Sequence, residues 1–414
     1  MSNRSHPEGA TYGSPLMDQT AEWLVEQALG ESDVGQILAG CCERLLAAGV
    51  PLSRAYLGYR TLHPLFSGIS LVWRRGQALG TYEHLHESAF LGEEWLRSPL
   101  YFLRSRELPF LRRRLTGNGA LLDFLLLEEL REQGATDYLA FQVSFMEHGD
   151  LGPDAQGLLG SWCTDRIGGF SDQDIRDLVR IQRRMAVACK VQIKEQVAQN
   201  VLNTYLGMDA GRKVLAGQIR RGDGEQIHAV LWFSDMRDST RLADVLESND
   251  FLSTVNTYFE CTAGAVLEAG GEVLRFIGDA VLAIFPIADD VSAAQACSRA
   301  LAAAADSRQR MIVVNEERKS RAMEPIEYGL GLHVGDVMYG NIGVAQRLEF
   351  SVVGAAANEA ARLEGLTKVL GHNVLLSEEF VTRLPGPYRP LGQHKLRGVG
   401  VPVEVFEFND RPSL

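Results

Sequence analysis

Residues 270–287 of the chain read GGEVLRFIGDAVLAIFPI. Two short strand-like segments, 272–276 and 281–285, flank the turn Ile277-Gly278-Asp279-Ala280, which is the pattern of a β-hairpin. The glycine pair at its start ends a helix that we predict over about residues 250–269. The stretch therefore predicts a helix followed by two paired strands.

The neighbouring elements extend this hairpin into a domain. We predict a buried strand at residues 228–233 before it and an Ala-rich helix at 291–317 after it. A second hairpin is predicted from residues 326–334 and 337–342, around Gly335-Asp336. The order β-α-β-β-α-β is that of a ferredoxin-like α+β fold, with one sheet and its helices on one face.

The rest of the chain divides around a long helix. Residues 171–206 contain no Gly or Pro, and Gly207 follows where the end of a helix favours glycine. We expect a connector whose second half pairs with a partner helix; the alternative is a helix packed on its own domain. Residues 212–224 form a basic, Gly-rich linker. We therefore predict a flexible tail, a mixed α/β regulatory domain, a connector with its linker, and a second domain, at residues 1–16, 17–170, 171–224 and 225–414.

Composition excludes several classes of protein. With 414 residues, 46% of them hydrophobic and 23% charged, the chain is typical of soluble multidomain proteins. A net charge of −12 argues against nucleic-acid binding as its main role. We recognise no secretory signal, and no apolar run approaches the ~18 residues of a membrane span. The six cysteines include no C-x-x-C pair. We expect a cytoplasmic protein.

Two carboxylates follow strands of the predicted sheet. Asp235 comes directly after an apolar strand, and Asp279 lies at the tip of the first hairpin. Because these strands are neighbours in the predicted sheet, both side chains could reach one point, where they suit Mg²⁺ or Mn²⁺ rather than zinc. The alternative is that Asp235 caps the next helix and Asp279 only forms a turn. The two together favour a metal site.

Two further patterns suit a phosphate group. Ser239 and Thr240 lie in a tight strand-to-helix connection, where backbone N–H groups can bind phosphate, although either residue could simply be an N-cap. Asn358 and Arg362 are four residues apart on a helix predicted over 355–367, so they share a face. They could orient a hydroxyl and stabilise phosphate charge. Spacing alone favours a surface arginine paired with a neighbouring glutamate.

Residues 228–408 resemble the class III nucleotidyl cyclase catalytic domain, which is found in adenylate and guanylate cyclases. Four motifs carry the resemblance in order: FSDMRDST at 233–240, GGEVLRFIGDA at 270–280, GLHVGDV at 331–337 and NEAARL at 358–363. The resemblance implies that Asp235 and Asp279, with the carbonyl of Met236, bind two Mg²⁺ or Mn²⁺ ions per active site. It also implies that Asn358 and Arg362 stabilise the transition state.

The resemblance also implies which residues bind the nucleotide. Arg275 and Ser351 correspond to the pair that reads the purine, and Arg397, or else Lys395, to the basic residue that binds the triphosphate. Such cyclases act as dimers whose sites combine the metal-binding aspartates of one subunit with the other residues of the second. This chain carries both sets, which implies a homodimer with two equivalent sites.

The purine pair departs from the family pattern. Adenylate cyclases usually have Lys with Asp or Thr there, and guanylate cyclases usually have Glu and Cys, whereas this chain has Arg275 and Ser351. A cationic donor and a hydroxyl acceptor fit adenine, although arginine can also donate to guanine. We therefore expect ATP as substrate. The alternatives are a guanylate cyclase and a non-catalytic nucleotide-binding regulator; a diguanylate cyclase is disfavoured because its Gly-Gly-Asp/Glu-Glu-Phe hairpin is absent.

The first domain gives weaker signals. Residues 157–163 and 169–175 resemble the end of a GAF-type sensor domain, which implies regulation by an unknown small-molecule or protein signal. A PAS-like or unrelated α/β module is the alternative. Cys41 and Cys42 lie on a predicted helix, where we expect buried, small apolar side chains rather than a redox switch.

Overall fold

The structure is a computed structural model that describes residues 15–86, 92–145, 157–288, 291–396 and 402–408. It contains two compact units, Met1–Val201 and Leu202–Leu414. Both combine helices with a sheet, which confirms the mixed α/β class predicted from the sequence. Among the described residues, every helix is too short or too polar to cross a membrane. The predicted tail lies outside the described residues, except for positions 15 and 16, which begin the first helix.

The first unit is built on a six-stranded antiparallel sheet in the order β3-β2-β1-β6-β5-β4. Side chains alternate between its two faces, so each face has its own core. The strands are β1 (Arg54–Arg60), β2 (Phe66–Arg74), β3 (Gly80–Leu85), β4 (Phe110–Arg114), β5 (Asp137–Ser144) and β6 (Gly157–Thr164).

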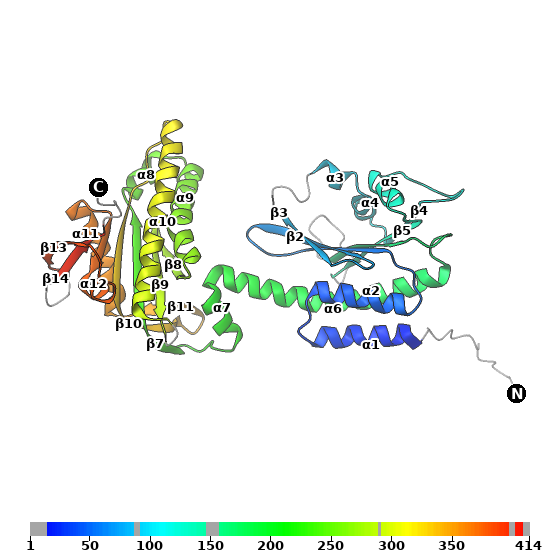
Figure 1. Ribbon diagram of the computed structural model, residues 1–414, viewed down its shortest axis with the longest axis horizontal. Coiled ribbons are helices and arrows are strands. Elements are labelled where there is room, and N and C mark those ends of the chain that lie inside the picture. Colours follow the sequence, from blue (N-terminus) through cyan, green and yellow to red (C-terminus); the bar gives the residue numbers. More distant parts are fainter. Residues whose placement is uncertain (1–14, 87–91, 146–156, 289–290, 397–401, 409–414) are drawn as a thin grey trace. The chain divides into compact units, whose positions relative to one another are not determined.

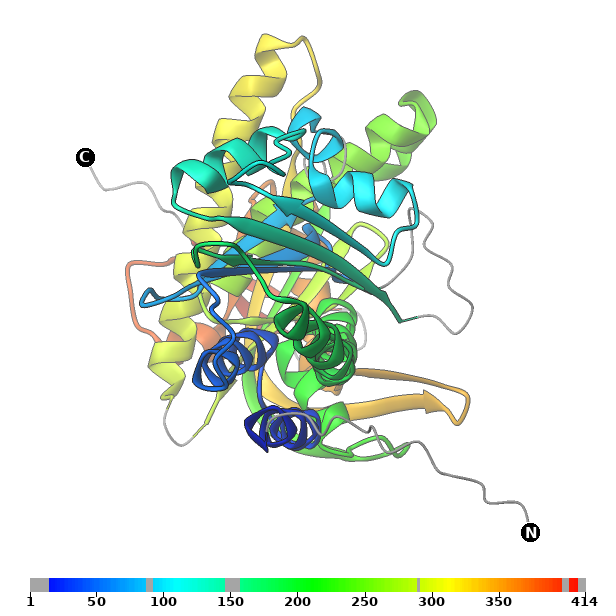
Figure 2. The same cartoon turned by 90° about the vertical axis from the view of Figure 1, so that its right-hand side faces the viewer.

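Helices cover both faces of this sheet (Figure 1). On one face lie α1 (Pro15–Leu29), α2 (Val34–Ala47) and α6 (Asp172–Leu206), which Figure 2 shows nearly end-on below the sheet. On the other lie α3 (Glu93–Leu96), α4 (Pro99–Ser105) and α5 (Leu125–Glu132). Cys41 and Cys42 are buried in the core beneath α2, as predicted.

The predicted long helix is α6, which has 35 residues. Its buried side chains, from Leu178 to Ile193, pack in the core of the first unit, whereas Val201 and Tyr205 near its end are exposed. The pairing of its last turns with a partner helix stays a prediction. The segment predicted as a basic, Gly-rich linker, residues 212–224, begins inside a further helix, α7 (Met208–Leu215), whose Ala210 packs in a core of the second unit.

The second unit is built on an eight-stranded sheet in the order β13-β14-β12-β10-β7-β9-β8, with β11 paired to β10. Its antiparallel part, β10-β7-β9-β8, is connected along the chain as β7-α9-β8-β9-α10-β10. The strands are β7 (Gly224–Met236), β8 (Glu272–Ile277), β9 (Ala280–Ile287), β10 (Tyr328–Val344), β11 (Arg347–Val353), β12 (Val374–Ser377), β13 (Arg389–His394) and β14 (Val403–Glu407).

The predicted second hairpin is wrong in its position. β10 runs without a break through Gly335-Asp336, and the chain turns only after Val344 to form β11. Gly335 is required for packing rather than for a turn, because a Cβ atom there would lie 2.6 Å from the Cβ of Ala356.

The expectation that helices cover one face of the second sheet is also wrong. The helices α9 (Ser248–Glu268) and α10 (Ala293–Ser320) pack in one core with Trp232 and Leu332. The opposite face is covered by α11 (Ala355–Leu370), which crosses β10 where a Cβ on Gly331 would lie 2.5 Å from the carbonyl oxygen of Ala360. Because glycines in β10 have no side chain, α11 can pack closely against this second face of the sheet. Two short helices, α8 (Ser239–Val245) and α12 (Glu378–Arg383), complete the unit.

Candidate active site at the end of β7

Asp235 is positioned by the buried end of β7. The hydroxyl of Ser234 accepts hydrogen bonds from Trp232 Nε1, at 3.1 Å, and from Tyr258 Oη, at 2.9 Å. Because side chains alternate along a strand, this anchoring turns Asp235 to the opposite face. Asp235 does not cap the next helix, since the N-cap residue of α8 is Asp238. The capping alternative for Asp235 is therefore excluded.

Asp279 lies beside Asp235, since β7 pairs with β9 and Asp235 stands opposite Ala280. Burial and the neighbouring Asp279 carboxylate raise the pKa of Asp235 to about 6. The Oδ2 atom of Asp279 is buried and accepts no hydrogen bond from any residue that the structure describes. Two ionised carboxylates in contact repel each other. A cation between them would remove this repulsion and would also give the buried Asp279 oxygen a partner.

Sequence reasoning missed a third carboxylate, Glu364 on α11. Burial, and then the charge of Asp235, raise its pKa to about 7. Within the described ranges, no three His, Cys, Asp or Glu side chains are grouped so that they alone could hold a metal ion. The donor set nevertheless fits a hard divalent cation, because such an ion commonly takes one or two carboxylates and completes its shell with water and phosphate oxygens.

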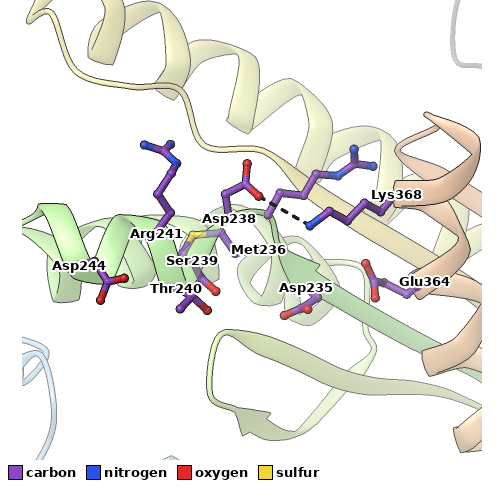
Figure 3. A pocket seen from close by; sticks show the side chains of 11 residues that line it. Asp235, Met236, Asp238, Ser239, Thr240, Arg241, Asp244, Glu364 and Lys368 are labelled. Carbon is purple, nitrogen blue, oxygen red and sulfur yellow. Dashed lines mark ion pairs between the residues drawn. The ribbon is translucent and has the colours of Figure 1, made fainter.

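A pocket of about 600 Å³ lies beside Asp235, a size suited to a small molecule. It is lined by residues 235–241 and Asp244 from the end of β7 and from α8, and by Glu364, Gly365 and Lys368 from α11 (Figure 3). Ser239 and Thr240 are therefore at the pocket. Neither is the N-cap of α8, which leaves the phosphate-binding hypothesis open for them.

The loop that forms this pocket is fixed by two hydrogen bonds of Arg237. Its Nη2 atom donates to the carbonyl oxygen of His372, at 3.0 Å. Its backbone N–H donates to the carbonyl oxygen of Glu327, at 2.8 Å. Asp238 adopts a left-handed backbone conformation with φ of 56°, which asparagine and aspartate tolerate better than most residues. Lys368 Nζ lies 3.7 Å from Asp238 Oδ1 and places a cation at the pocket that the sequence had not indicated (Figure 3).

Asn358 and Arg362 lie on α11 one turn apart, as predicted from their spacing. Asn358 is exposed and Arg362 is partly buried. In the part of the chain that the structure describes, no ion pair joins Arg362 to Glu359 or Glu364; the carboxylate of Glu359 lies 3.4 Å from His333 Nε2 instead. The alternative, in which Arg362 pairs with a neighbouring glutamate at the surface, is therefore not supported by the described residues of α11.

Arg275 and Ser351 lie on β8 and β11. Arg275 follows an irregularity in the pairing of β8 with β9. Its Nε lies 3.0 Å from Oε1 of Glu349 in an ion pair, and among the described residues this Nε forms no hydrogen bond. Ser351 is buried, and its hydroxyl has no partner among the described residues. Glu349 precedes Ser351 by two residues on the same face of β11, so a carboxylate adjoins the proposed purine pair.

The residues predicted to bind the purine and to stabilise the transition state do not line the described part of this pocket. Its described lining contains Asp235, Met236, Ser239 and Thr240 but not Arg275, Ser351, Asn358 or Arg362. Asp279 adjoins it through its contact with Asp235. Lys395 is exposed after β13, and Arg397 lies outside the described residues. One chain thus presents the two predicted sets at separate places.

Comparison with known proteins gives one family for this region. The family model for the adenylate and guanylate cyclase catalytic domain matches residues 225–401. An adenylate cyclase of Anabaena cylindrica is 35% identical over 159 residues, which are 37% of this chain and 30% of that protein. The chain thus matches less than a third of that relative's length.

Two solved structures are also similar. The adenylyl cyclase CyaB from P. aeruginosa is 24% identical, with a TM-score of 0.42 over 46% of this chain and 99% of that one. The guanylyl cyclase Cya2 is 26% identical, with a TM-score of 0.40 over 44% of this chain and 92% of that one.

Proposed function

Because residues 225–401 belong to the adenylate and guanylate cyclase catalytic domain family, we propose that the chain is an adenylate cyclase. It converts ATP to 3′,5′-cyclic AMP and pyrophosphate. The observation that carries the proposal is the contact between Asp235 and Asp279 at the edge of a pocket of nucleotide size. One buried oxygen of this pair, Asp279 Oδ2, has no hydrogen-bond partner in the described part of the chain. A regulator that binds a nucleotide without a metal ion has no need of this costly pair.

The reaction forms a bond between the ribose 3′-oxygen and the α-phosphorus and breaks the bond to the pyrophosphate oxygen, while the hydroxyl proton leaves to solvent. Asp235, Asp279 and the carbonyl of Met236 would hold two Mg²⁺ or Mn²⁺ ions, which acidify the hydroxyl and neutralise phosphate charge. Asn358 orients the ribose, and Arg362 stabilises the charge that develops on the α-phosphate.

The remaining residues bind the nucleotide. Arg275 and Ser351 contact the purine; the Ser351 hydroxyl, which has no hydrogen-bond partner among the described residues, is available to it. The backbone of Ser239 and Thr240 binds phosphate oxygens at the start of α8, and Lys395 or Arg397 neutralises the pyrophosphate. The separation of the two sets within one chain supports a homodimer in which each site combines both subunits.

The first unit is, in this proposal, a GAF-like sensor whose long helix α6 passes a signal to the cyclase dimer. A helix pair can transmit a small rotation or shift between domains. The exposed Val201 and Tyr205 near the end of α6 are available for such pairing.

The decisive assay measures products of the full chain with ATP or GTP, in Mg²⁺ and in Mn²⁺. We expect cyclic AMP to exceed cyclic GMP by at least tenfold, since Arg275 and the Ser351 hydroxyl match the N1 acceptor and N6 donor of adenine. An excess of cyclic GMP would reverse the substrate assignment. The absence of either product, also from a chain without residues 1–206, would favour the non-catalytic regulator.

A guanylate cyclase is the second candidate, because Glu349 adds a carboxylate beside Arg275. Guanine presents two donors on its Watson–Crick edge, and a carboxylate can accept from both. We expect Glu349→Gln to lower any activity with GTP several-fold more than activity with ATP. Glu316→Gln, which changes an exposed carboxylate on α10, is the matched control.

The carboxylates at the pocket predict a pH-dependent effect of metal on stability. The raised pKa values, about 6 for Asp235 and about 7 for Glu364, mean that the folded chain keeps protons which the unfolded chain releases. The stability that these groups contribute is therefore present at low pH and is lost as pH rises through these values. We expect Mn²⁺ to raise the melting temperature more at pH 8 than at pH 5, as measured by differential scanning fluorimetry. An equal effect at both pH values would contradict metal binding by these carboxylates.

A further inference from the structure

The first unit contains a partly buried arginine, Arg54, two of whose donor atoms are buried and lack an acceptor among the described residues. Its guanidinium carbon lies 5.9 Å from the ring centre of Tyr56, which supplies no full negative charge. Arg54 begins β1, and its Nε and Nη1 atoms are buried and form no hydrogen bond within the structure as described. Burial of a guanidinium is costly unless a carboxylate or other acceptors replace its hydration. Native proteins rarely leave such donors unsatisfied, and each case calls for an explanation. The two atoms indicate a missing acceptor.

A second arginine lies opposite Arg54 on the neighbouring strand β2. Arg74, the last residue of β2, pairs in register with Arg54, and like charges in this position repel each other. Among the described residues, the side chain of Arg74 forms no hydrogen bond or ion pair, although its carbonyl oxygen accepts from the backbone N–H of Gln77, at 3.1 Å. The same row continues through Cys163 on β6 to Tyr138 on β5. Residues paired in this way point to one face of the sheet, so the four side chains share a face.

The neighbours of Arg54 do not supply the missing negative charge. Burial raises the pKa of Cys163 to about 11 and holds that of Tyr138 above its usual range, so both groups are neutral at pH 7. The carboxylate of Asp137 is already bound by Arg112, at 2.6 Å, and by the backbone N–H of Phe170, at 3.0 Å. The row therefore offers donors and a net positive charge.

The surroundings define what an acceptor from outside must look like. Tyr138 is fully buried, and within the described ranges its hydroxyl has no hydrogen-bond partner. It packs in a core with Leu103, Leu111 and Leu127, under the helices α4 and α5. Both arginines lie at the ends of their strands and are partly exposed, so this end of the sheet is reachable from solvent.

We propose that Arg54, Arg74 and Tyr138 form a binding site for a small organic anion in the first unit. A carboxylate or phosphate group accepts from the two guanidinium groups and from the tyrosine hydroxyl, and an apolar body packs against the leucines. This assigns a chemical class to the signal expected at the first domain. The site does not depend on the proposed cyclase activity, because its test measures binding.

The test is isothermal titration of the full chain with benzoate, phenyl phosphate and the neutral benzamide. We expect one or both anions to bind at millimolar concentration or tighter and benzamide not to bind; the tighter anion identifies the head group. Arg54→Met should weaken binding at least tenfold. Its melting temperature without ligand should equal or exceed that of the wild type, because the substitution removes two buried donor atoms that lack an acceptor among the described residues.

Arg113→Met is the matched control. Arg113 lies on the same row, opposite Tyr138, but it is paired with Asp123 at 2.8 Å. We expect this variant to keep anion binding. The proposal is overturned if no organic anion binds the wild type, if benzamide binds as well as benzoate, or if Arg54→Met binds like the wild type. Inorganic phosphate is titrated as a fourth probe, and binding of this ion alone would also overturn the proposal.

Discussion

The Asp279→Asn variant is expected to lose cyclic nucleotide formation by about 10³-fold or more, equivalent to about 4 kcal/mol of transition-state stabilisation. The substitution keeps the shape of the side chain but removes one of the two charges that would hold the metal ions. Because it also ends the repulsion with Asp235, the metal-free variant should melt at the same temperature as the wild type or above it. Initial rates with ATP and Mn²⁺, together with a melting curve, measure both effects.

Asp244→Asn is the control for this variant. Asp244 lines the same pocket from α8 but is exposed and does not share the contact between Asp235 and Asp279. It should keep turnover within about threefold of the wild type. Turnover retained by Asp279→Asn would remove Asp279 from the proposed metal site, whereas an equal loss in both variants would point to the charge of the pocket as a whole.

The meeting of Asp235 and Asp279 could be predicted because it depends on strand order alone. Both residues end strands that the hydrophobic pattern predicts, and these strands are neighbours in any β-α-β-β-α-β sheet. No contact between distant side chains had to be known. The same reasoning placed Asn358 and Arg362 on one helix face, since helical spacing is a local property.

The wrong prediction of a turn at Gly335 shows a limit of prediction from local sequence patterns. A glycine followed by an aspartate is a common turn signal, but here the glycine lies inside β10 and lets Ala356 approach it. Glycine at a turn and glycine at a close contact look alike in a single sequence. The position of α11 on the second face of the sheet follows from such contacts and was therefore missed.

The same limitation concealed Glu364 and Lys368. On the sequence they read as ordinary charges of an exposed helix, since no local pattern separates them from other surface residues. They reach the pocket because α11 crosses β10 at Gly329 and Gly331, where Cβ atoms would collide with the helix. Only the packing of the helix on the sheet reveals them.

The second large effect concerns the proposed division of each site between two subunits. Asp235→Ala and Arg362→Ala should each be nearly inactive alone. When equal amounts of the two chains are mixed and allowed to exchange, half of the dimers are mixed. In each mixed dimer, one of two sites combines an intact Asp235 with an intact Arg362, so we expect about a quarter of the wild-type activity. Native mass spectrometry measures the fraction of mixed dimers.

A chain that carries both substitutions distinguishes a shared site from a site within one chain. Mixed in equal amounts with the wild type, it should reduce activity to about a quarter of that of the same total amount of wild type if sites are shared, because every mixed dimer then lacks a complete site. If each chain held a complete site, the mixture would keep about half, and the two single variants would not rescue each other. The second result would contradict the shared site even if the residues at the end of β7 still proved essential.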